Sequence, residues 1–254
     1  MFVAVLAPWI APYSYQDQDT LHILAFPGSE HWLGTDRLGR DLLSRMIYGA
    51  RVSLFVGVFS TVVALIIGTI YGTLSAYLGG RIDNLMMRVV DVVFALPDLL
   101  MIILITVLMG RGVVGVFIAL TLVSWVTIAR LVRGEVLRIK EYPYIQAARA
   151  LGASHFRIML KEIFPNILGI LVVTLSFRIP VAILAESTLS FVGLGIAPPA
   201  SSWGTLASDG WTAIKFYPHL ILFPSLAIFF TILSFNFLGE GLREFLDPRS
   251  EKNG

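Results

Sequence analysis

Long apolar runs dominate this 254-residue chain and alternate with short polar stretches. Five runs are long enough to form full membrane-crossing helices, and they cover residues 53–78, 84–109, 113–134, 166–191 and 217–239. A helix needs about 20 predominantly apolar residues to cross the hydrocarbon core of a bilayer. The pattern therefore predicts an all-α, polytopic membrane protein.

Glycine and proline mark the breaks between these runs. Gly79-Gly80 ends the first run, and Gly110-Arg111-Gly112 predicts a tight turn between the second and the third. Residues 192–216 are rich in Gly, Pro and Ser and predict a long loop, and the tail after Gly239 is polar. Because the sequence has no soluble domain, low-complexity tract or clear repeat, we expect residues 1–254 to form a single transmembrane domain.

The chain begins with an apolar stretch, residues 1–12, that is too short to cross a membrane and contains Pro8 and Pro12. No basic segment precedes it, so it is a poor match to a signal peptide. We expect it to be the outer end of a first membrane helix whose beginning is missing, as a shortened chain or a misplaced start codon would produce. A completed first helix would give six spans, with both termini on one side.

An amphipathic stretch precedes the first full run. Its apolar residues recur at roughly helical spacing: Leu38, Leu42, Leu43 and Met46. Charged residues between them predict a helix over residues 36–53 that lies on the membrane surface. An ordinary amphipathic helix packed on its own protein fits this pattern equally well.

The segment 141–165 is polar and amphipathic although long apolar runs flank it. Pro143 suits the first turn of a helix, and Gly152 suits the left-handed residue that ends one. One face of this first helix carries Tyr144, Ala147, Ala148 and Leu151. The small alanines at its middle would allow a partner to approach closely.

A second short helix is expected to follow in the same segment. Ser154 is a suitable N-cap, and Pro165 marks the start of the next membrane helix. Its apolar face is predicted to carry Phe156, Met159, Leu160 and Ile163 and to pack under the membrane helices. The spacing alone fits two alternatives, a rigid docking element and a hairpin that merely lies on the bilayer.

Composition and charge narrow the class of protein. Apolar residues make up 56% of the chain, and charged residues 14%, against roughly 25% in soluble domains. The net charge of +2 does not indicate nucleic-acid binding. The absence of cysteine excludes thiol chemistry. Because the four histidines are scattered without ligand spacing, no metal site is expected. Twelve Lys and Arg residues lie on the side of the 141–165 loop and the C-terminus, and six on the other, so the first side is predicted to be cytoplasmic.

The motif in residues 146–165 resembles the cytoplasmic coupling loop of ABC-importer permeases. That pattern reads Glu-Ala-Ala, three residues, Gly, and about ten residues later Ile-x-Leu-Pro. Here the corresponding positions hold Gln146-Ala147-Ala148, Gly152 and Glu162-Ile163-Phe164-Pro165. Gln146 replaces Glu, Glu162 replaces Ile with Ile163 beside it, and Phe164 replaces Leu. The resemblance assigns coupling to an ATPase to Gln146, Ala147, Ala148, Gly152, Ile163 and Pro165, with no salt bridge at Gln146.

Three further segments resemble a narrower branch, the permeases of dipeptide, oligopeptide and nickel importers. They are residues 31–57, residues 186–195 followed by Pro198 and Ser202-Trp203-Gly204, and residues 236–249. The resemblance implies a multi-pass permease subunit of the cell inner membrane that imports peptides, nickel or another small solute. It further implies a second permease, two cytoplasmic ATPases that bind ATP and Mg, and an external binding protein. The chain lacks a phosphate-binding Gly-x4-Gly-Lys-Ser/Thr loop, so it is expected to be neither an enzyme nor a cofactor carrier.

Among the charged residues within the apolar runs, four are candidates for a role in transport: Asp91, Asp98, Arg178 and Glu186. Charges inside a membrane usually face the protein interior or water. One interpretation is that these residues line a translocation path; the other is that they form structural pairs, such as Asp91 with Arg88. Arg178 and Glu186 are eight positions apart, about 12 Å along a helix, so direct contact between them is not expected.

Two other functions compete with a permease subunit. A self-sufficient secondary transporter would be expected to show more spans and inverted repeats. An intramembrane aspartyl enzyme would need two facing acids, and Asp91 with Asp98 is a weak candidate because both lie in the same run.

Overall fold

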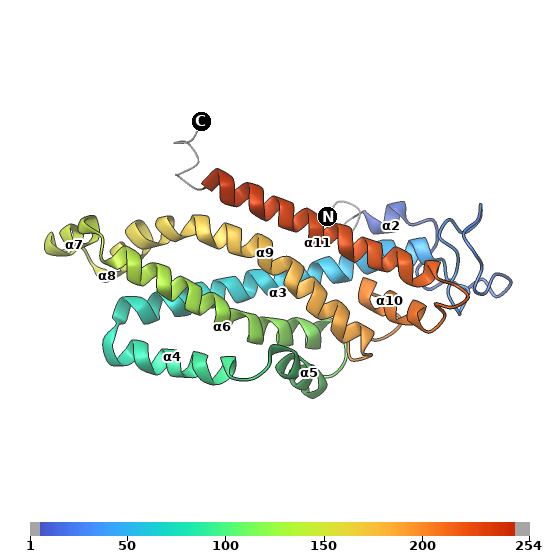
Figure 1. The fold of residues 1–254 in the computed structure, drawn as a ribbon, viewed down its shortest axis with the longest axis horizontal. Coiled ribbons are helices and arrows are strands. Elements are labelled where there is room, and N and C mark those ends of the chain that lie inside the picture. The colour runs from blue at the N-terminus through green and yellow to red at the C-terminus, as the bar shows by residue number, and fades with distance from the viewer. Residues whose placement is uncertain (1–5, 247–254) are drawn as a thin grey trace. The chain divides into compact units, whose positions relative to one another are not determined.

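The computed structural model describes residues 6–246. Within that range the chain forms helices and one isolated bridge, between Thr35 and Asp41, and no strand, which confirms the all-α prediction (Figure 1). The α-helices are α2 (Ala7–Ile10), α3 (Leu42–Leu78), α4 (Gly80–Phe94), α5 (Asp98–Met109), α6 (Val113–Lys140), α7 (Pro143–Ala150), α8 (His155–Arg157), α9 (Phe164–Phe191), α10 (Trp203–Trp211) and α11 (His219–Leu246). A π-helix, η1 (Ile158–Ile163), joins α8 to α9.

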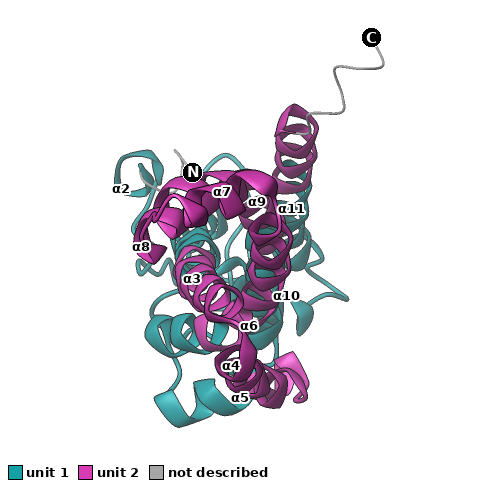
Figure 2. Cartoon of the chain, turned by 90° about the vertical axis from the view of Figure 1, so that its left-hand side faces the viewer, with its two compact units in different colours: residues 1–60, 102–120, 179–234 teal, residues 61–101, 121–178, 235–254 magenta. Residues whose placement is uncertain are grey.

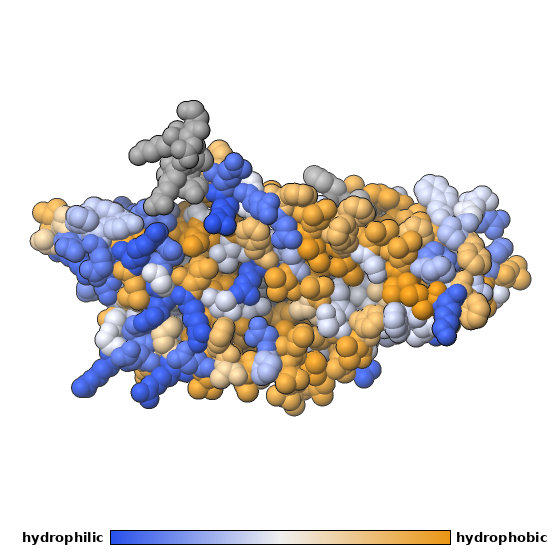
Figure 3. Space-filling view, viewed as in Figure 1, coloured by the Kyte–Doolittle hydropathy of each residue, from blue (hydrophilic) through white to orange (hydrophobic). Residues whose placement is uncertain are grey.

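All five apolar runs appear as helical stretches. Helices α3, α6 and α11 and the continuous stretch His155–Phe191 are each long and apolar enough to cross a membrane. The second run instead forms α4 and α5, which are bent by 84° and together make a fifth candidate span. Hydrophobic residues dominate the surface over the long helices, whereas hydrophilic residues gather near α7, α8 and the beginning of α4 (Figure 3).

Pro97 explains the bend in the second run. Helix α4 ends at Phe94, and α5 begins at Asp98, directly after the proline. Proline has no backbone N–H and disfavours helical geometry in the residue before it. The predicted run over residues 84–109 therefore forms two helices that Pro97 separates.

The predicted surface helix over residues 36–53 is wrong. Helix α3 begins at Leu42 and continues without interruption to Leu78, so residues 42–53 are the first turns of a candidate membrane helix and residues 36–41 precede it. Asp41 starts the helix because its Oδ2 accepts a hydrogen bond from the backbone N–H of Ser44 at 2.7 Å. Leu42 packs with Leu206 and Leu220, as in the alternative of an amphipathic helix packed on its own protein.

The long loop over residues 192–216 contains a helix that the sequence pattern did not predict. The Ser202 hydroxyl accepts from the backbone N–H of Thr205, and the Thr205 hydroxyl accepts from that of Ser202. This reciprocal capping box starts α10. At the other end of the chain α2 is only four residues long, and the remainder of the predicted outer end of a first span, residues 1–5, lies outside the described residues.

The chain divides into two compact units (Figure 2). Unit 1 comprises residues 1–60, 102–120 and 179–234, and unit 2 comprises residues 61–101, 121–178 and 235–254. Helices α3, α5, α6, α9 and α11 each contribute to both units. The expectation of a single transmembrane domain stays a prediction, and each unit is described by itself below.

Candidate functional site

The predicted coupling loop forms a hairpin of α7 and α8 within unit 2. Pro143 occupies the first turn of α7, as predicted. Gly152 has φ +79°, and the N–H groups of Gly152 and Ala153 donate to the carbonyls of Arg149 and Ala148, both at 3.0 Å. This pair of bonds is the Schellman arrangement, which ends a helix through a left-handed glycine. The predicted role of Gly152 as a helix terminator is confirmed.

The second half of the hairpin differs from the prediction in one respect. The Ser154 hydroxyl accepts from the backbone N–H of Arg157, so the predicted N-cap of α8 is confirmed. The helix then passes through η1 into α9, so Pro165 does not mark a restart. Because a π-helix advances its bonds to i+5, the buried face shifts to Ile158, Ile163 and Ile167.

That shift corrects the predicted apolar face of the second helix. Ile163 is fully buried and Met159 is half-buried, but Phe156 and Leu160 are 68% and 50% exposed. In the first helix Ala148 is half-buried, whereas Tyr144, Ala147 and Leu151 are exposed. The hairpin thus buries one row of isoleucines and leaves large apolar side chains in contact with the surroundings.

Contacts that sequence reasoning missed hold the hairpin in place. Ile145, which lies outside the predicted face of α7, is fully buried in a cluster with Ile128, Val132 and Ile158. Tyr77, near the end of α3, shares a hydrogen bond of 2.9 Å between its Oη and His155 Nδ1. The Arg149 guanidinium lies 5.3 Å from the centre of the Tyr77 ring. Only the three-dimensional structure brings Tyr77 to this loop.

The intramembrane acids of unit 2 have separate partners. Asp91 pairs with Arg130 at 2.5 Å, and not with Arg88 as the structural alternative proposed. Asp98 acts electrostatically on Arg178, which is half-buried. No hydrogen bond joins Asp91 to Asp98 among the described residues, so the two acids do not share a proton as an aspartyl dyad would. Asp83, which the sequence analysis did not select, makes a bidentate pair with Arg133, with N–O distances of 2.7 and 2.6 Å.

Glu186 lies in unit 1 and is completely buried. Its two carboxylate oxygens accept hydrogen bonds from Ser190 at 2.7 Å and from Ser53 at 3.1 Å. Ser202 donates to Ser190, and the Trp203 backbone N–H donates to Ser53. These bonds connect α3, α9 and α10, so Glu186 holds helices together and the path-lining interpretation finds no support at this residue.

A pocket of about 470 Å³ lies in unit 1. Charged residues on its wall include Asp36, Arg45, Arg111 and Asp209. Arg45 Nη1 lies 2.6 Å from Asp36 and 3.5 Å from Asp209, so three of these charges pair with one another. The sequence analysis gave no signal for this pocket because its lining comes from three separated segments.

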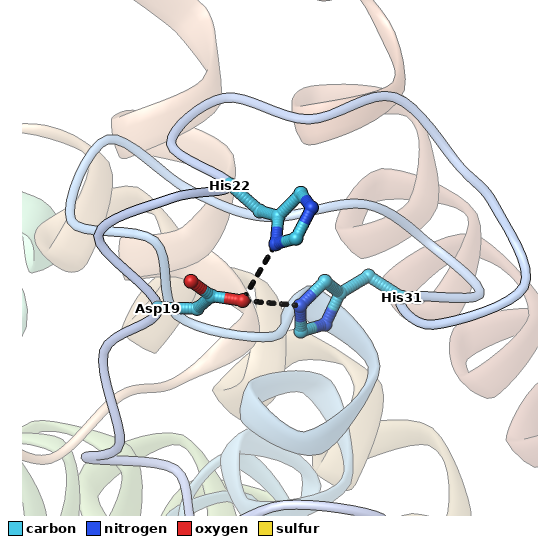
Figure 4. A group of neighbouring side chains, drawn as sticks. All are labelled: Asp19, His22 and His31. Carbon is cyan, nitrogen blue, oxygen red and sulfur yellow. Dashed lines mark hydrogen bonds and ion pairs between the residues drawn. The ribbon is translucent and has the colours of Figure 1, made fainter.

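Two histidines that the sequence analysis considered scattered lie together in unit 1. His22 and His31 both face the carboxylate of Asp19 (Figure 4). The hydrogen bond to His22 lowers the pKa of Asp19, and the same bond raises the pKa of His22. Asp19 therefore stays ionised in this arrangement, and two imidazoles and one carboxylate are the donor set that could hold a metal ion.

Comparison with known proteins places this geometry in context. The sequence profile of the family described as "Binding-protein-dependent transport system inner membrane component" matches residues 64–252. The oligopeptide transport system permease protein OppC of Bacillus subtilis (strain 168) is 43% identical over 252 residues, which cover 99% of this chain and 83% of that protein. The dipeptide transport system permease protein DppC of the same organism is 46% identical, covering 97% and 78%. The glutathione transport system permease protein GsiD of Pectobacterium atrosepticum is 42% identical, covering 97% and 82%.

Solved structures share the fold at low sequence identity. A chain of the MetNI methionine ABC transporter in an inward-facing conformation aligns with a TM-score of 0.67 at 19% identity, covering 81% of this chain and 96% of that one. A chain of an amino acid ABC transporter crystallised with histidines gives 0.58 at 20% identity, covering 81% and 94%. The profile spans most of the chain and the relatives align along nearly all of it, so this protein belongs to the family of binding-protein-dependent transport system inner membrane components.

Proposed function

We propose that this chain is the permease subunit of an ATP-driven importer for peptides or a related small solute, and that it forms half of the translocation pathway. The relatives named above are permeases for oligopeptides, dipeptides and glutathione, all of them short peptides. The other half comes from a second, homologous permease, and a binding protein delivers the solute from outside.

The observation that carries the coupling role is the α7–α8 hairpin. The buried Ile145 side chain and the hydrogen bond between Tyr77 and His155 hold the hairpin in place, whereas Leu151 and Phe156 are 88% and 68% exposed. Large exposed apolar residues on a fixed element are typical of a surface that binds another protein. We assign this surface, together with Gln146, Ala147, Ala148 and Gly152, to an ATPase subunit. Ile163 is buried and Pro165 lies in the continuous helix, so we assign these two residues to packing that stabilises the hairpin and not to the docking surface.

ATP and Mg bind to the partner ATPases in this proposal. The chain itself has no phosphate-binding loop motif, so it transmits motion and does not hydrolyse nucleotide. The excess of Lys and Arg on the hairpin side supports a cytoplasmic position for the hairpin and the C-terminus. There the hairpin can meet soluble ATPases.

The absence of native cysteine allows a direct test. Leu151 and Leu21 are both 88% exposed, so Leu151→Cys and Leu21→Cys are a matched pair. Thiol cross-linking in native membranes, followed by mass spectrometry, should join Leu151→Cys to a subunit with a phosphate-binding loop and should not do so for Leu21→Cys. A membrane-impermeant maleimide should label only Leu21→Cys in intact cells. Equal labelling of both, or ATP-independent transport by the purified chain alone, would contradict the proposal and favour a secondary transporter.

A further inference from the structure

The histidine cluster of unit 1 lies in the segment that precedes α3. The ligand atoms of Asp19, His22 and His31 all lie within 4.8 Å of one another. Asp19 Oδ2 is 2.7 Å from His22 Nδ1 and 3.7 Å from His31 Nε2 (Figure 4). The other oxygen of Asp19 accepts from the backbone N–H of Leu21, which fixes the direction of the carboxylate.

His31 is held as a metal-binding histidine would be. Its Nδ1 lies 3.0 Å from Oδ1 of Asp41, whose side chain is buried and whose Oδ2 caps α3. Histidine ligands of metals commonly donate their second ring N–H to a carboxylate, which fixes both the tautomer and the ring. When His31 is neutral and its Nδ1 proton points to Asp41, its Nε2 lone pair faces Asp19. Two electron-pair donors that face each other at 3.7 Å are too far apart for a hydrogen bond and suit a cation between them.

The distances fit a tetrahedral ion after a small adjustment. Bonds of about 2.1 Å place two ligand atoms roughly 3.4 Å apart. His31 Nε2 is already close to that separation from Asp19, whereas His22 Nδ1 must move from 2.7 Å to about 3.4 Å from Asp19. The side chains of His22 and Asp19 are 45% and 37% exposed, so they can adjust, and a water molecule can reach the remaining coordination position.

We propose that Asp19, His22 and His31 form a binding site for a divalent transition-metal ion such as Zn²⁺. Two imidazole nitrogens and one carboxylate oxygen favour Zn²⁺, Ni²⁺ or Cu²⁺ over Mg²⁺ and Ca²⁺, which prefer oxygen ligands. The bound ion fastens the segment around residues 19–31 to the N-terminus of α3 through Asp41. This site is independent of the transport proposal and of the solute carried.

The test uses the full-length chain, purified without a polyhistidine tag, stripped with EDTA and titrated calorimetrically with ZnCl₂ alone. We expect about one ion per chain, by analogy with single three-ligand zinc sites. His22→Ala and Asp19→Asn should each weaken the affinity by more than about tenfold, and Asp41→Asn by about 10- to 100-fold, as removal of an outer carboxylate typically does. Asp17→Asn, an exposed carboxylate two positions away, should leave the affinity unchanged.

His22 is exposed, so its removal should not unfold the chain, and an unchanged size-exclusion profile checks this. Substitution of Co²⁺ should give the visible absorption of a tetrahedral ion in the original chain and lose it in His22→Ala. Zinc binding that is absent, or equally tight in His22→Ala, would overturn the proposal, as would a preference for Ca²⁺ over Zn²⁺.

Discussion

The α7–α8 hairpin of unit 2 and the segment 13–41 of unit 1 are held in place by different forces. The hairpin is fixed by burying Ile145, Ile158 and Ile163, with one hydrogen bond to Tyr77. The segment 13–41 is held largely by polar contacts around two acids: Asp36 accepts from Arg40 and Arg45, and Asp41 from His31 and Ser44. Apolar packing depends little on ionic strength, whereas a polar network is weakened when any one of its partners is removed. The two regions should therefore fail under different substitutions.

Removal of Asp36 should have the largest effect on stability. Among the residues that the structure describes, Asp36→Ala leaves the guanidinium of Arg45, which is 3% exposed, with only the 3.5 Å contact to Asp209. Breaking a buried pair in this way costs about 3 to 5 kcal/mol. The temperature at which half of the detergent-solubilised chain loses its folded size-exclusion peak should fall steeply. Asp17→Ala, an exposed acid of the same segment, is the control; an equal loss for both would show that the network contributes nothing.

The corresponding test in unit 2 is Ile145→Ala. Truncating a buried isoleucine costs about 2 to 5 kcal/mol, because a cavity remains. Hydrogen exchange of the backbone in α7 and α8 should accelerate, and cross-linking to the ATPase through Leu151→Cys should decline.

Leu151→Ala separates docking from folding in the same hairpin. Leu151 is 88% exposed, so its truncation should leave hydrogen exchange unchanged while reducing the amount of ATPase that co-purifies. If Leu151→Ala and Ile145→Ala produced the same exchange pattern, the division into a buried and a docking face would be incorrect.

A smaller effect is expected at the turn of the hairpin. An added Cβ at Gly152 meets no atom of the described residues within 4 Å, so Gly152→Ala costs only the left-handed backbone, about 1 to 2 kcal/mol. Gly134 has equally open space but an ordinary helical backbone within α6, so Gly134→Ala should instead stabilise by about 0.5 to 1 kcal/mol. Opposite shifts of the unfolding temperature would confirm the turn geometry, and shifts of the same sign would refute it.

The smallest change is expected for Gln146→Glu, which restores the acidic residue of the resembling pattern. Gln146 is exposed, and within residues 6–246 its side chain donates only to the Glu141 carbonyl, at 3.3 Å, so stability should change by less than about 0.5 kcal/mol. ATPase co-purification should become more sensitive to salt, because a new surface charge is screened. No change in salt dependence would place Gln146 outside the contact.

Local signals in the sequence predicted local structure well. The apolar runs, Pro143, Gly152 and Ser154 each act through backbone rules that operate within a few residues, and each is confirmed. The predicted apolar faces of the hairpin were wrong for two reasons. The 3.6-residue period does not hold through η1, and the spacing of Tyr144, Ala147, Ala148 and Leu151 indicated a face that excludes Ile145. The π geometry has no sequence signature as clear as a glycine or a proline.

The sequence pattern could not predict contacts between segments that are far apart along the chain. Tyr77 and His155 are 78 positions apart, and Ser53 and Glu186 are 133 apart. His22 and His31 showed no ligand spacing because Asp19 and Asp41, which orient them, lie outside any short motif. The assignment of the hairpin to an ATPase contact remains a prediction until the cross-linking experiment is done.

The π-helix between α8 and α9 has a mechanical consequence. It contains one residue more than an α-helical turn of the same length, and no break separates it from the membrane helix that follows. Reversion to α geometry would turn everything beyond it by about 100° and shift it by about 1.5 Å. A force on the hairpin that restored α geometry would therefore rotate α9 and shift it along its axis at the same time.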